Sequence, residues 1–393
     1  MAKRLRAGTV SPGGALRDAG WVRGALLRWY RRARRDLPWR RTRDPYRIWL
    51  SEIMLQQTRV ETVVPYYERF LAAFPSVGRL AAAPLDHVLK RWEGLGYYSR
   101  ARNLHRAAQV VAREHAGEFP RTSAALRSLP GVGRYTAAAV ASIAFDEPVA
   151  VLDGNVKRVL ARLFAIDTPI ESAATIARLW QLAESLVAPR TPGDFNQALM
   201  ELGATVCMPR GPRCDSCPIR SACRALATGR VAELPRKRAR RAVPIVNAVA
   251  AAIERRGRYL VVQRPADGLL GGLWELPGGV VPPRHAARAT LEEHVRRRVG
   301  VRIAVGAAIG EFTHTFTHLK LRVQVYRATV TRGRAPRDAG TPPAKTCWLA
   351  ARHFDELACA TIDRRILEHV AAQDGARPAP PRRLDRARGA ASA

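Results

Sequence analysis

The chain has 393 residues, of which 47% are hydrophobic, so it can form two or three packed domains and is not disordered as a whole. Its 66 Lys and Arg residues outnumber 33 Asp and Glu residues and give a formal net charge of +33. Counterion release makes nucleic acid the expected partner, with an acidic membrane surface as the alternative. No stretch reaches the roughly 20 apolar residues of a membrane-spanning helix, and no secretory signal follows the basic N-terminus. We therefore expect a soluble, intracellular protein.

Residues 1–20 are basic and contain Gly and Pro, and we expect them to form a loose arm. Over residues 21–227, apolar side chains recur every three to four positions and Pro and Gly stand at helix-length intervals, which predicts an all-α region. Capping residues or first-turn prolines mark three helix starts: Asp44-Pro45 for a helix to Thr58, Pro84 for one ending near Glu93, and Thr122 or Ser123 for one stopping near Leu129.

A charged stretch at residues 228–244 predicts a linker, and a solvated spacer and a DNA-contacting segment are equally compatible with it. Beyond it, β-branched runs between Gly, Pro or basic turns alternate with helical stretches, so residues 245–372 are expected to form an α+β domain. The expected strands are 245–253, 259–263, 303–307, 321–328 and 346–349, and the expected helices are 285–299 and 362–372. Residues 373–393 are rich in Arg, Pro and Ala, and we expect them to be disordered.

Four of the six cysteines lie close together in a C-x6-C-x2-C-x5-C pattern, at Cys207, Cys214, Cys217 and Cys223. A disulfide framework would spread cysteines along the chain, so this grouping predicts metal ligation. Four thiolates in one loop can ligate a [4Fe–4S] cluster. Structural zinc also accepts four thiolates, but it usually pairs two C-x2-C units, and this loop contains one. We expect one structural [4Fe–4S] cluster, with zinc as the alternative.

A glycine turn between two helices is predicted by the run Leu129-Pro130-Gly131-Val132-Gly133-Arg134. Glycines permit close backbone approach, and the free amides at the next helix's N-terminus can bind a phosphate regardless of base sequence. A helical hairpin that only packs is the alternative.

Two carboxyl side chains are candidates for breaking an N-glycosidic bond, which needs an acid for the leaving base and an anion near the sugar cation. Glu52 lies at the edge of an apolar helix face, and Asp153 stands where it can cap a helix. Apolar surroundings help a carboxyl group keep its proton, whereas a helix N-terminus favours the ionised form. A surface glutamate and a purely structural cap are the alternatives, and these residues alone leave both open.

These features, in this order, resemble the helix–hairpin–helix DNA glycosylase superfamily and, within it, the MutY-type adenine DNA glycosylases. The resemblance covers residues 37–223 and implies two all-α lobes, a six-helix barrel and a cluster lobe, with DNA in the cleft between them. The matching stretches are 37–40, 49–58, 94–104, the hairpin at 129–137, 152–159 and the four cysteines.

The resemblance implies a catalytic role for four residues. Glu52 is similar to the acid that protonates adenine, and Asp153 to the carboxylate that stabilises the sugar cation. Tyr135 and Asn155 resemble groups that support the cation and orient the carboxylates. Related endonuclease III proteins carry a strand-cutting lysine at the position of Tyr135, so we expect a monofunctional glycosylase that leaves an abasic site.

The resemblance also implies residues that contact DNA. Gln57 and Tyr97 resemble residues that wedge into the duplex near an oxidised guanine while adenine is flipped out. The family's C-terminal Nudix-like domain reads 8-oxoguanine with a Phe-Ser-His loop. This chain has Phe316, Thr317 and His318, which keep the hydroxyl group and add a methyl group. An ordinary strand-edge turn is the alternative.

Residues 245–372 resemble that Nudix-like domain. A Nudix pyrophosphatase needs a row of glutamates on one helix to bind Mg²⁺. Here Glu292 and Glu293 are followed by the arginines 296–298, so we do not expect that activity.

We therefore expect a monomeric base excision repair enzyme that removes adenine mispaired with 8-oxoguanine or guanine in double-stranded DNA. Its Arg-rich and Ala-rich usage is typical of GC-rich bacterial genomes, so we expect it in the cytoplasm beside the nucleoid. A related glycosylase with another base preference is one alternative, and Tyr135 and the 316–318 loop argue against it. A non-catalytic DNA-binding iron–sulfur protein is the other, and the two carboxyl groups argue against it.

Overall fold

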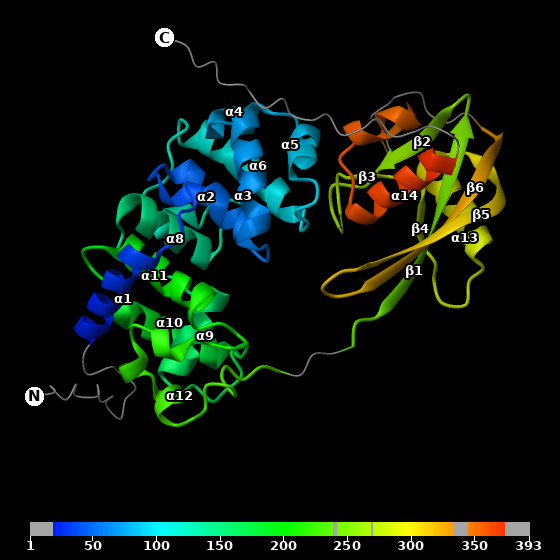
Figure 1. Cartoon of the computed structure of the whole chain (residues 1–393). Helices are drawn as coiled ribbons and strands as arrows, with labels where there is room; N and C mark the ends of the chain where they lie inside the picture. The colour runs from blue at the N-terminus through cyan, green and yellow to red at the C-terminus, as the bar shows by residue number, and fades with distance from the viewer. Residues whose placement is uncertain (1–18, 239–241, 269, 334–344, 374–393) are drawn as a thin grey trace, which may run out of the picture. The chain divides into compact units, whose positions relative to one another are not determined.

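The structure of the chain is a computed structural model that describes residues 19–238, 242–268, 270–333 and 345–373 (Figure 1). Nearly all of the arm expected at 1–20 and of the tail expected at 373–393 lies outside these ranges. The chain divides into two compact units, residues 1–83 with 102–240, and residues 84–101 with 241–393. The change of unit at residues 240–241 falls within the predicted linker. The presence of residues 84–101 in the second unit has no counterpart in the sequence-based division.

The described part of the first unit is all-α, as the helical periodicity predicts. Short 3₁₀ turns lie at Pro38–Arg40, Cys214–Ser216 and Arg220–Ala222. The helices are α1 (Ala19–Ala33), α2 (Pro45–Leu55), α3 (Val60–Ala73), α4 (Val77–Ala82), most of α6 (Ser99–Glu114), α7 (Ser123–Leu126), α8 (Arg134–Phe145), α9 (Gly154–Leu163), α10 (Ala173–Leu186), α11 (Pro192–Thr205) and α12 (Arg224–Ala227). None of the helices in the described ranges is long and apolar enough to cross a membrane.

The predicted helices begin where expected, and the one predicted from Pro84 to near Glu93 is α5 (Leu85–Trp92), but the ends of the other two differ. Asp44 caps α2 by accepting a hydrogen bond from the backbone N–H of Tyr46 at 2.9 Å, and Thr122 caps α7. The predicted end of α2 at Thr58 is wrong: the helix stops at Leu55, and Gln57 has a left-handed backbone (φ 58°) that a helix cannot continue through. Likewise α7 ends at residue 126, before the predicted stop near 129.

Small residues let the helices that carry the candidate site approach closely. A Cβ atom at Gly193 on α11 would lie 2.5 Å from the backbone oxygen of Ser142 on α8. One at Gly203, near the other end of α11, would lie 2.6 Å from the Cβ of Asn155 on α9. Because α11 contacts both α8 and α9 at these glycines, side chains from three helices meet in one place.

The second unit combines a seven-stranded sheet with helices and is α+β, as predicted. The strand order is β3-β2-β1-β6-β5, β4 pairs with β1, β7 pairs with β2, and only the β1–β6 pair among these is parallel. Its elements are α5 (Leu85–Trp92), β1 (Ile245–Arg255), β2 (Arg258–Gln263), β3 (Trp274–Glu275), β4 (Gly278–Val280), α13 (Ala287–Val299), β5 (Arg302–Thr315), β6 (Lys320–Arg332), β7 (Thr346–Ala350), a 3₁₀ turn at Ala351–Glu356 and α14 (Thr361–Gln373).

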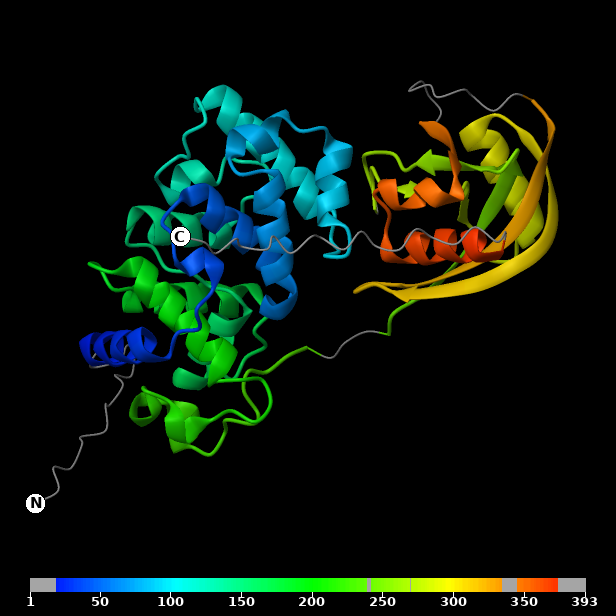
Figure 2. The same ribbon diagram turned by 45° about the horizontal axis from the view of Figure 1, so that its top comes forward.

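Burial of α13 against the sheet forms the core of this unit. Leu291, Val295 and Val299 on α13 pack with alternate residues of β1, such as Val249 and Ile253, as expected for a half-buried strand facing a helix. Figure 2 shows β5 and β6 as one long curved ribbon with α14 alongside it.

All five predicted strands are present, but β5 runs on to Thr315, far beyond the predicted 303–307, and β6 continues past the predicted 321–328 to Arg332. Register shifts lie between Val305 and Gly310, and the β5 residues beyond them are exposed or half-buried, so the apolar alternation is lost on that strand. The short strands β3 and β4 were not predicted, because they have only two and three residues.

Candidate active site

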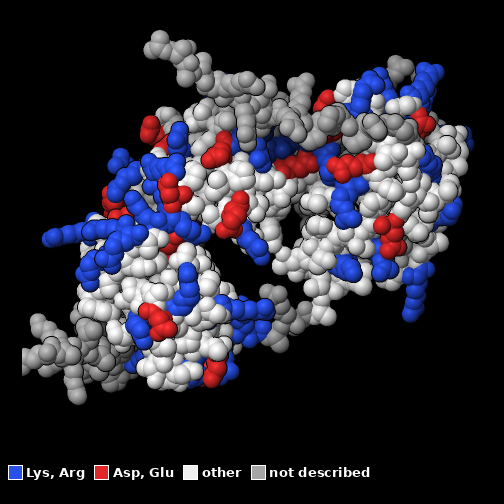
Figure 3. Space-filling view, viewed as in Figure 1, with Lys and Arg blue, Asp and Glu red and all other residues white. Residues whose placement is uncertain are grey.

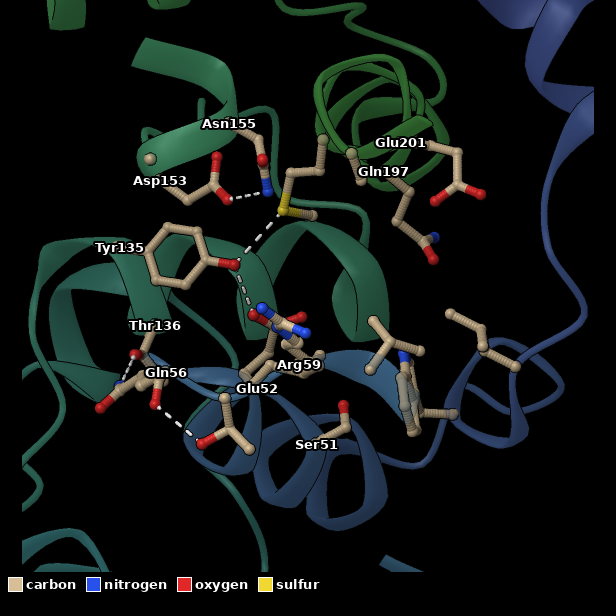
Figure 4. Close-up of a pocket in the computed structure, with 18 of the residues that line it drawn as sticks. Ser51, Glu52, Gln56, Arg59, Tyr135, Thr136, Asp153, Asn155, Gln197 and Glu201 are labelled. Atoms are coloured by element: carbon tan, nitrogen blue, oxygen red, sulfur yellow. Dashed lines mark hydrogen bonds between the residues drawn. The ribbon is translucent and has the colours of Figure 1, made fainter. Parts of the chain in front are cut away.

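A cavity of about 960 Å³ in the first unit brings together the four residues predicted to be catalytic. Glu52 comes from α2, Tyr135 from α8, and Asp153 and Asn155 from the start of α9. Figure 4 shows the Tyr135 ring between Glu52 on one side and Asp153 with Asn155 on the other. Residues far apart in the sequence therefore share one pocket.

Glu52 lies in the buried part of the pocket wall, with only 5% of its surface exposed. Its Oε2 accepts a hydrogen bond from the Tyr135 hydroxyl at 2.6 Å. Burial raises the pKa of Glu52 to about 7, and the negative charge of Asp153 adds to this, while the Tyr135 hydrogen bond and Arg40 oppose it. Glu52 can thus carry a proton near neutral pH, as a general acid must.

Asp153 caps α9 and is hydrogen-bonded through both oxygens. Oδ1 accepts from the backbone N–H of Val156 at 2.7 Å, and Oδ2 accepts from the side-chain amide of Asn155 at 2.9 Å. Burial raises the pKa of Asp153, although these bonds and Arg158 oppose it. The helix N-terminus, which was expected to favour the ionised form, has the smaller effect on the pKa of Asp153, because burial has removed water from the carboxyl group.

A chain of hydrogen bonds leads from Asp153 toward the cysteine-rich loop. The Asn155 side-chain oxygen accepts from Arg158 Nη2 at 2.8 Å, and Arg158 Nε donates to the backbone oxygen of Cys207 at 2.8 Å. Arg158 also donates to the backbone oxygen of Gly203 at 2.7 Å. Only tertiary contacts reveal this bridge, so no role for Arg158 was predicted from the sequence.

A buried carboxylate not singled out from the sequence lines the same pocket. Glu201 on α11 accepts hydrogen bonds from Arg35 and Arg40, each Nη2 lying 2.8 Å from Oε2. Burial opposes ionisation of Glu201, but these hydrogen bonds lower its pKa to about 2. Gln197 and Met200 from α11 also line the cavity, and the Met200 sulfur lies 3.3 Å from the Tyr135 hydroxyl. Spacing along one helix gave no signal for any of them.

Only part of the predicted DNA-binding hairpin presents itself to solvent. Gly131 and Gly133 are exposed and line the cavity mouth, and Gly133 precedes α8 at its N-terminus. Leu129 and Val132 are buried, so their side chains pack inside the hairpin, and a contact of these two residues with DNA would be made by the backbone. Gly131 has a left-handed φ of 75°, and a Cβ there would lie 2.5 Å from the Asn103 side chain. Glycine is therefore required at this turn.

The Arg134 side chain is directed away from the turn. Its guanidinium group lies 3.8 Å from the centre of the Trp180 ring and pairs with Glu184 at 2.5 Å, both on α10. Arg134 therefore ties α8 to α10 in the structure, and a contact with phosphate would require it to leave both partners. The prediction of Arg134 as a DNA ligand did not anticipate this competing role.

The four clustered cysteines line one small cavity of about 30 Å³. All four thiols are free and half-buried, and Val206, Leu226 and Val231 provide apolar walls. Arg162 Nη1 donates to the sulfur of Cys207 at 3.3 Å and to the backbone oxygen of Met208 at 2.8 Å. Within the described ranges, no three His, Cys, Asp or Glu side chains are arranged as ligands of a single metal ion. The four thiols facing one apolar cavity fit the donor set of an iron–sulfur cluster.

The predicted lesion-reading residues lie in the second unit, except Gln57, which is exposed at the cavity in the first unit. Phe316 is half-buried at the turn between β5 and β6, and Thr317 and His318 are exposed there. Tyr97 is 43% exposed, and its hydroxyl lies 2.6 Å from Oγ1 of Thr317. The loop is thus a hairpin tip in contact with Tyr97.

On α13, the helix on which a Nudix pyrophosphatase would carry its glutamates, an arginine side chain binds acidic and backbone oxygens. Glu292 and Glu293 on α13 are exposed, while Arg298 donates to Glu275 at 2.8 Å and to the backbone oxygen of Gly278 at 3.0 Å. A guanidinium group in this place repels a divalent cation. Figure 3 shows Lys and Arg on the visible face of each unit, with Asp and Glu more sparsely set among them.

Comparison with known proteins gives two family matches and several similar relatives. Residues 50–185 match the HhH-GPD superfamily base excision DNA repair protein model, and residues 248–369 match the NUDIX domain model. The Rattus norvegicus protein named adenine DNA glycosylase is 39% identical, with 89% of this chain and 78% of the relative aligned. The Mus musculus and Homo sapiens proteins of the same name are each 40% identical, with 93% and 88% of this chain and 81% and 73% of the relative aligned.

Proposed function

Because this chain belongs to the adenine DNA glycosylase family of base excision repair, we propose that it removes adenine paired with 8-oxoguanine or guanine and leaves an abasic site. It is a DNA glycosylase specific for adenine and acts on DNA. The opposite base and the fate of the sugar are the parts that we propose here.

The observation that carries the proposal is the contact between Glu52 and Tyr135 inside a pocket shared with Asp153. Glu52, with its pKa near 7, donates its proton to the leaving adenine. The bond from C1′ to the base then breaks with its electron pair going to adenine, and the positive charge left on the sugar is stabilised by the Asp153 carboxylate, held by Asn155. Water adds to C1′, and its proton returns to solvent or to a carboxylate, which completes hydrolysis.

The absence of an amine nucleophile supports the monofunctional assignment. Tyr135 occupies the position where strand-cutting relatives are expected to carry a lysine, and its hydroxyl donates to Glu52. The described residues that line the cavity include arginines but no lysine. Without a Schiff base, the product remains an abasic site in an unbroken strand.

We propose that the four cysteines hold one [4Fe–4S] cluster, because their thiols face a common apolar cavity. The cluster would stiffen the loop between Cys207 and Cys223, and it takes part in no step of the reaction. Iron and sulfide analysis of the purified protein, with its visible absorbance, tests this assignment. Zinc in place of iron, with no visible absorbance, would contradict it. Cys217→Ser should lower the iron content, while Cys347→Ser in the second unit should not.

Phe316, Thr317 and His318 are proposed to read the oxidised guanine, with Tyr97 and Gln57 wedged into the duplex beside it. Exposure of Thr317 and Tyr97 supports this assignment, because both side chains can reach a partner without unfolding. The Thr317 hydroxyl can serve as donor or acceptor toward the altered base. We expect the protein to act as a monomer, in the bacterial cytoplasm beside the nucleoid.

The test is excision from duplexes that differ in a single base pair, read with and without alkali. Adenine opposite 8-oxoguanine or guanine should yield strand breaks only after alkali, and adenine opposite thymine should yield none. Breaks without alkali would refute the monofunctional assignment. Preference for a pyrimidine lesion would favour a related glycosylase with another base specificity.

Glu52→Gln tests the acid in the same assay. The variant should lose nearly all excision while still binding the duplex. Glu118→Gln removes an equal charge from an exposed site outside the pocket and should excise normally. Full activity in Glu52→Gln would exclude Glu52 as the acid.

A further inference from the structure

The segment of residues 84–101, which we call the Tyr97 segment, is held by the C-terminal domain although it precedes that domain by more than a hundred residues. The Tyr98 hydroxyl donates to the backbone oxygen of Cys359 at 2.9 Å in a buried contact. The Gln263 side chain donates to Asp86 at 2.7 Å. The two ends of the segment are thus attached to the same unit.

A paired, half-buried contact lies between these two attachments. Arg364 on α14 donates to Glu93 with Nε at 2.8 Å and Nη2 at 3.2 Å, and both side chains are only 17% exposed. Lys90 adds a further hydrogen bond to Glu93 at 2.7 Å. Arg364 is itself fixed by donating to the backbone oxygen of Leu357 at 2.6 Å. Two parallel N–H donors from Arg364 and a third donor from Lys90 leave the Glu93 carboxylate little freedom to move.

The chain between Glu93 and Tyr97 is a short turn that links the fixed Glu93 carboxylate to the Tyr97 ring. Gly94, Gly96 and Tyr97 all have left-handed backbones, with φ of 96°, 71° and 48°. Arg100 donates to the backbone oxygen of Gly96 at 3.2 Å, and its guanidinium group lies 5.4 Å from the centre of the Tyr97 ring. We therefore expect a displacement of Glu93 to shift the Tyr97 ring.

At the tip of this turn, the Tyr97 hydroxyl meets Oγ1 of Thr317 at 2.6 Å. Thr317 belongs to the β5–β6 tip, and Phe316 beside it packs edge-on against His314, with ring centres 4.6 Å apart. Both hydroxyl groups are at the surface, so the pair depends on the backbones that carry it and not on burial.

We propose that Glu93 and Arg364 are positioning residues that hold Tyr97 against Thr317, so that the wedge and the lesion reader meet DNA as one preassembled pair. This inference rests on the proposed roles of Tyr97 and Thr317. It assigns a catalytic contribution to an ion pair that touches neither the base nor the pocket.

Hydrogen exchange of the full-length protein tests the positioning without relying on enzymatic activity. Arg364→Gln should speed exchange of the amides at residues 94–98 by about tenfold or more, because restraints within one network are coupled. Arg298→Gln is the matched control: it breaks an ion pair of similar exposure in the same unit, with Glu275, that does not contact the Tyr97 segment. Unchanged exchange in Arg364→Gln, or an equal increase in Arg298→Gln, would overturn the proposal.

Single-turnover excision opposite 8-oxoguanine tests whether the Glu93–Arg364 ion pair acts through Tyr97. Arg364→Gln should slow excision about tenfold in the wild-type background and less than about twofold when Tyr97→Ala is already present, since coupled residues are not additive. Glu93→Gln should behave in the same way. A merely structural loss would lower the rate by the same factor in both backgrounds, and that result would refute the positioning role.

The lesion preference and the positioning role of Arg364 can be refuted independently of each other. If the wild-type protein excises no adenine opposite 8-oxoguanine, the proposed lesion preference is wrong, and the exchange experiment still decides whether Arg364 holds the turn. If the wild type is active but the effects of Arg364 and Tyr97 multiply independently, the preference stands and the positioning role is wrong.

Discussion

Replacing Glu52 by Gln removes an ionisable group from the pocket while keeping the side chain's shape and its ability to accept the Tyr135 hydrogen bond. The pKa of Glu52 is raised from its ordinary value of 4.5 to about 7 because the side chain is buried. Between these two values the folded protein holds a proton that the unfolded chain has released. The wild-type protein must therefore lose stability as the pH rises through this window.

The size of this loss follows from the pKa difference. At about 1.4 kcal/mol per pKa unit, the ionised Glu52 costs the folded state ~3 kcal/mol above pH 7. Below pH 4.5 both states are protonated and the cost disappears. Glu52→Gln should hence be more stable than the wild type by ~3 kcal/mol at pH 8, with almost no difference at pH 4. The variant that loses activity gains stability.

Urea unfolding followed by circular dichroism across pH 4 to 8.5 measures this difference directly. Glu118→Gln, at an exposed site, is the control for removing one negative charge. The reasoning is refuted if Glu52→Gln and the wild type differ by the same free energy at both ends of the pH range. It is also refuted if the variant is the less stable protein at pH 8.

Three further results are expected. Tyr135→Phe removes a hydrogen bond that lowers the pKa of Glu52, so the alkaline limb of the pH–rate profile should move to higher pH, and an unmoved limb would contradict the contact. Gly203→Ala places a Cβ 2.6 Å from that of Asn155 and should slow excision about tenfold or more, whereas the Cβ of Gly78→Ala would only touch the Ser76 hydroxyl at 4.0 Å and should be neutral in the same assay. Duplex affinity measured by titration should fall linearly on a log–log scale with added salt, because a chain of net charge +33 releases counterions from DNA, and a flat dependence would exclude this electrostatic contribution.

Local chemistry made parts of the fold predictable. Asp44 caps α2 because its side chain reaches an amide two residues away, which the sequence alone can indicate. The end of the same helix depends on the left-handed Gln57, whose backbone is set by tertiary packing. The second half of β5 escaped prediction because its residues are exposed or half-buried and follow no apolar alternation.

The residues of the candidate site were likewise predictable only in part from the sequence. Glu52 and Asp153 could be chosen as a pair from their chemistry and their motifs, but nothing in their spacing reveals that Tyr135 donates to Glu52. Glu201 and Arg158 were missed because their roles depend on contacts with distant parts of the chain, Arg40 for Glu201 and the backbone of Gly203 and Cys207 for Arg158. Leu129 and Val132 belong to the hairpin motif, but both side chains are buried. A sequence motif thus includes residues that pack as well as residues that face a ligand.

The placement of residues 84–101 in the second unit has a consequence for biosynthesis. The ribosome delivers this segment well before α14, so during translation Glu93 and Tyr98 exist without Arg364 and Cys359. In the nascent chain Glu93 keeps its contact with Lys90, but the contacts of the segment with Arg364 and Cys359 form only once the end of the second unit has emerged. Completion of the Tyr97 turn is thereby tied to completion of the chain, and a nascent chain stalled before α14 lacks the contacts that hold this turn.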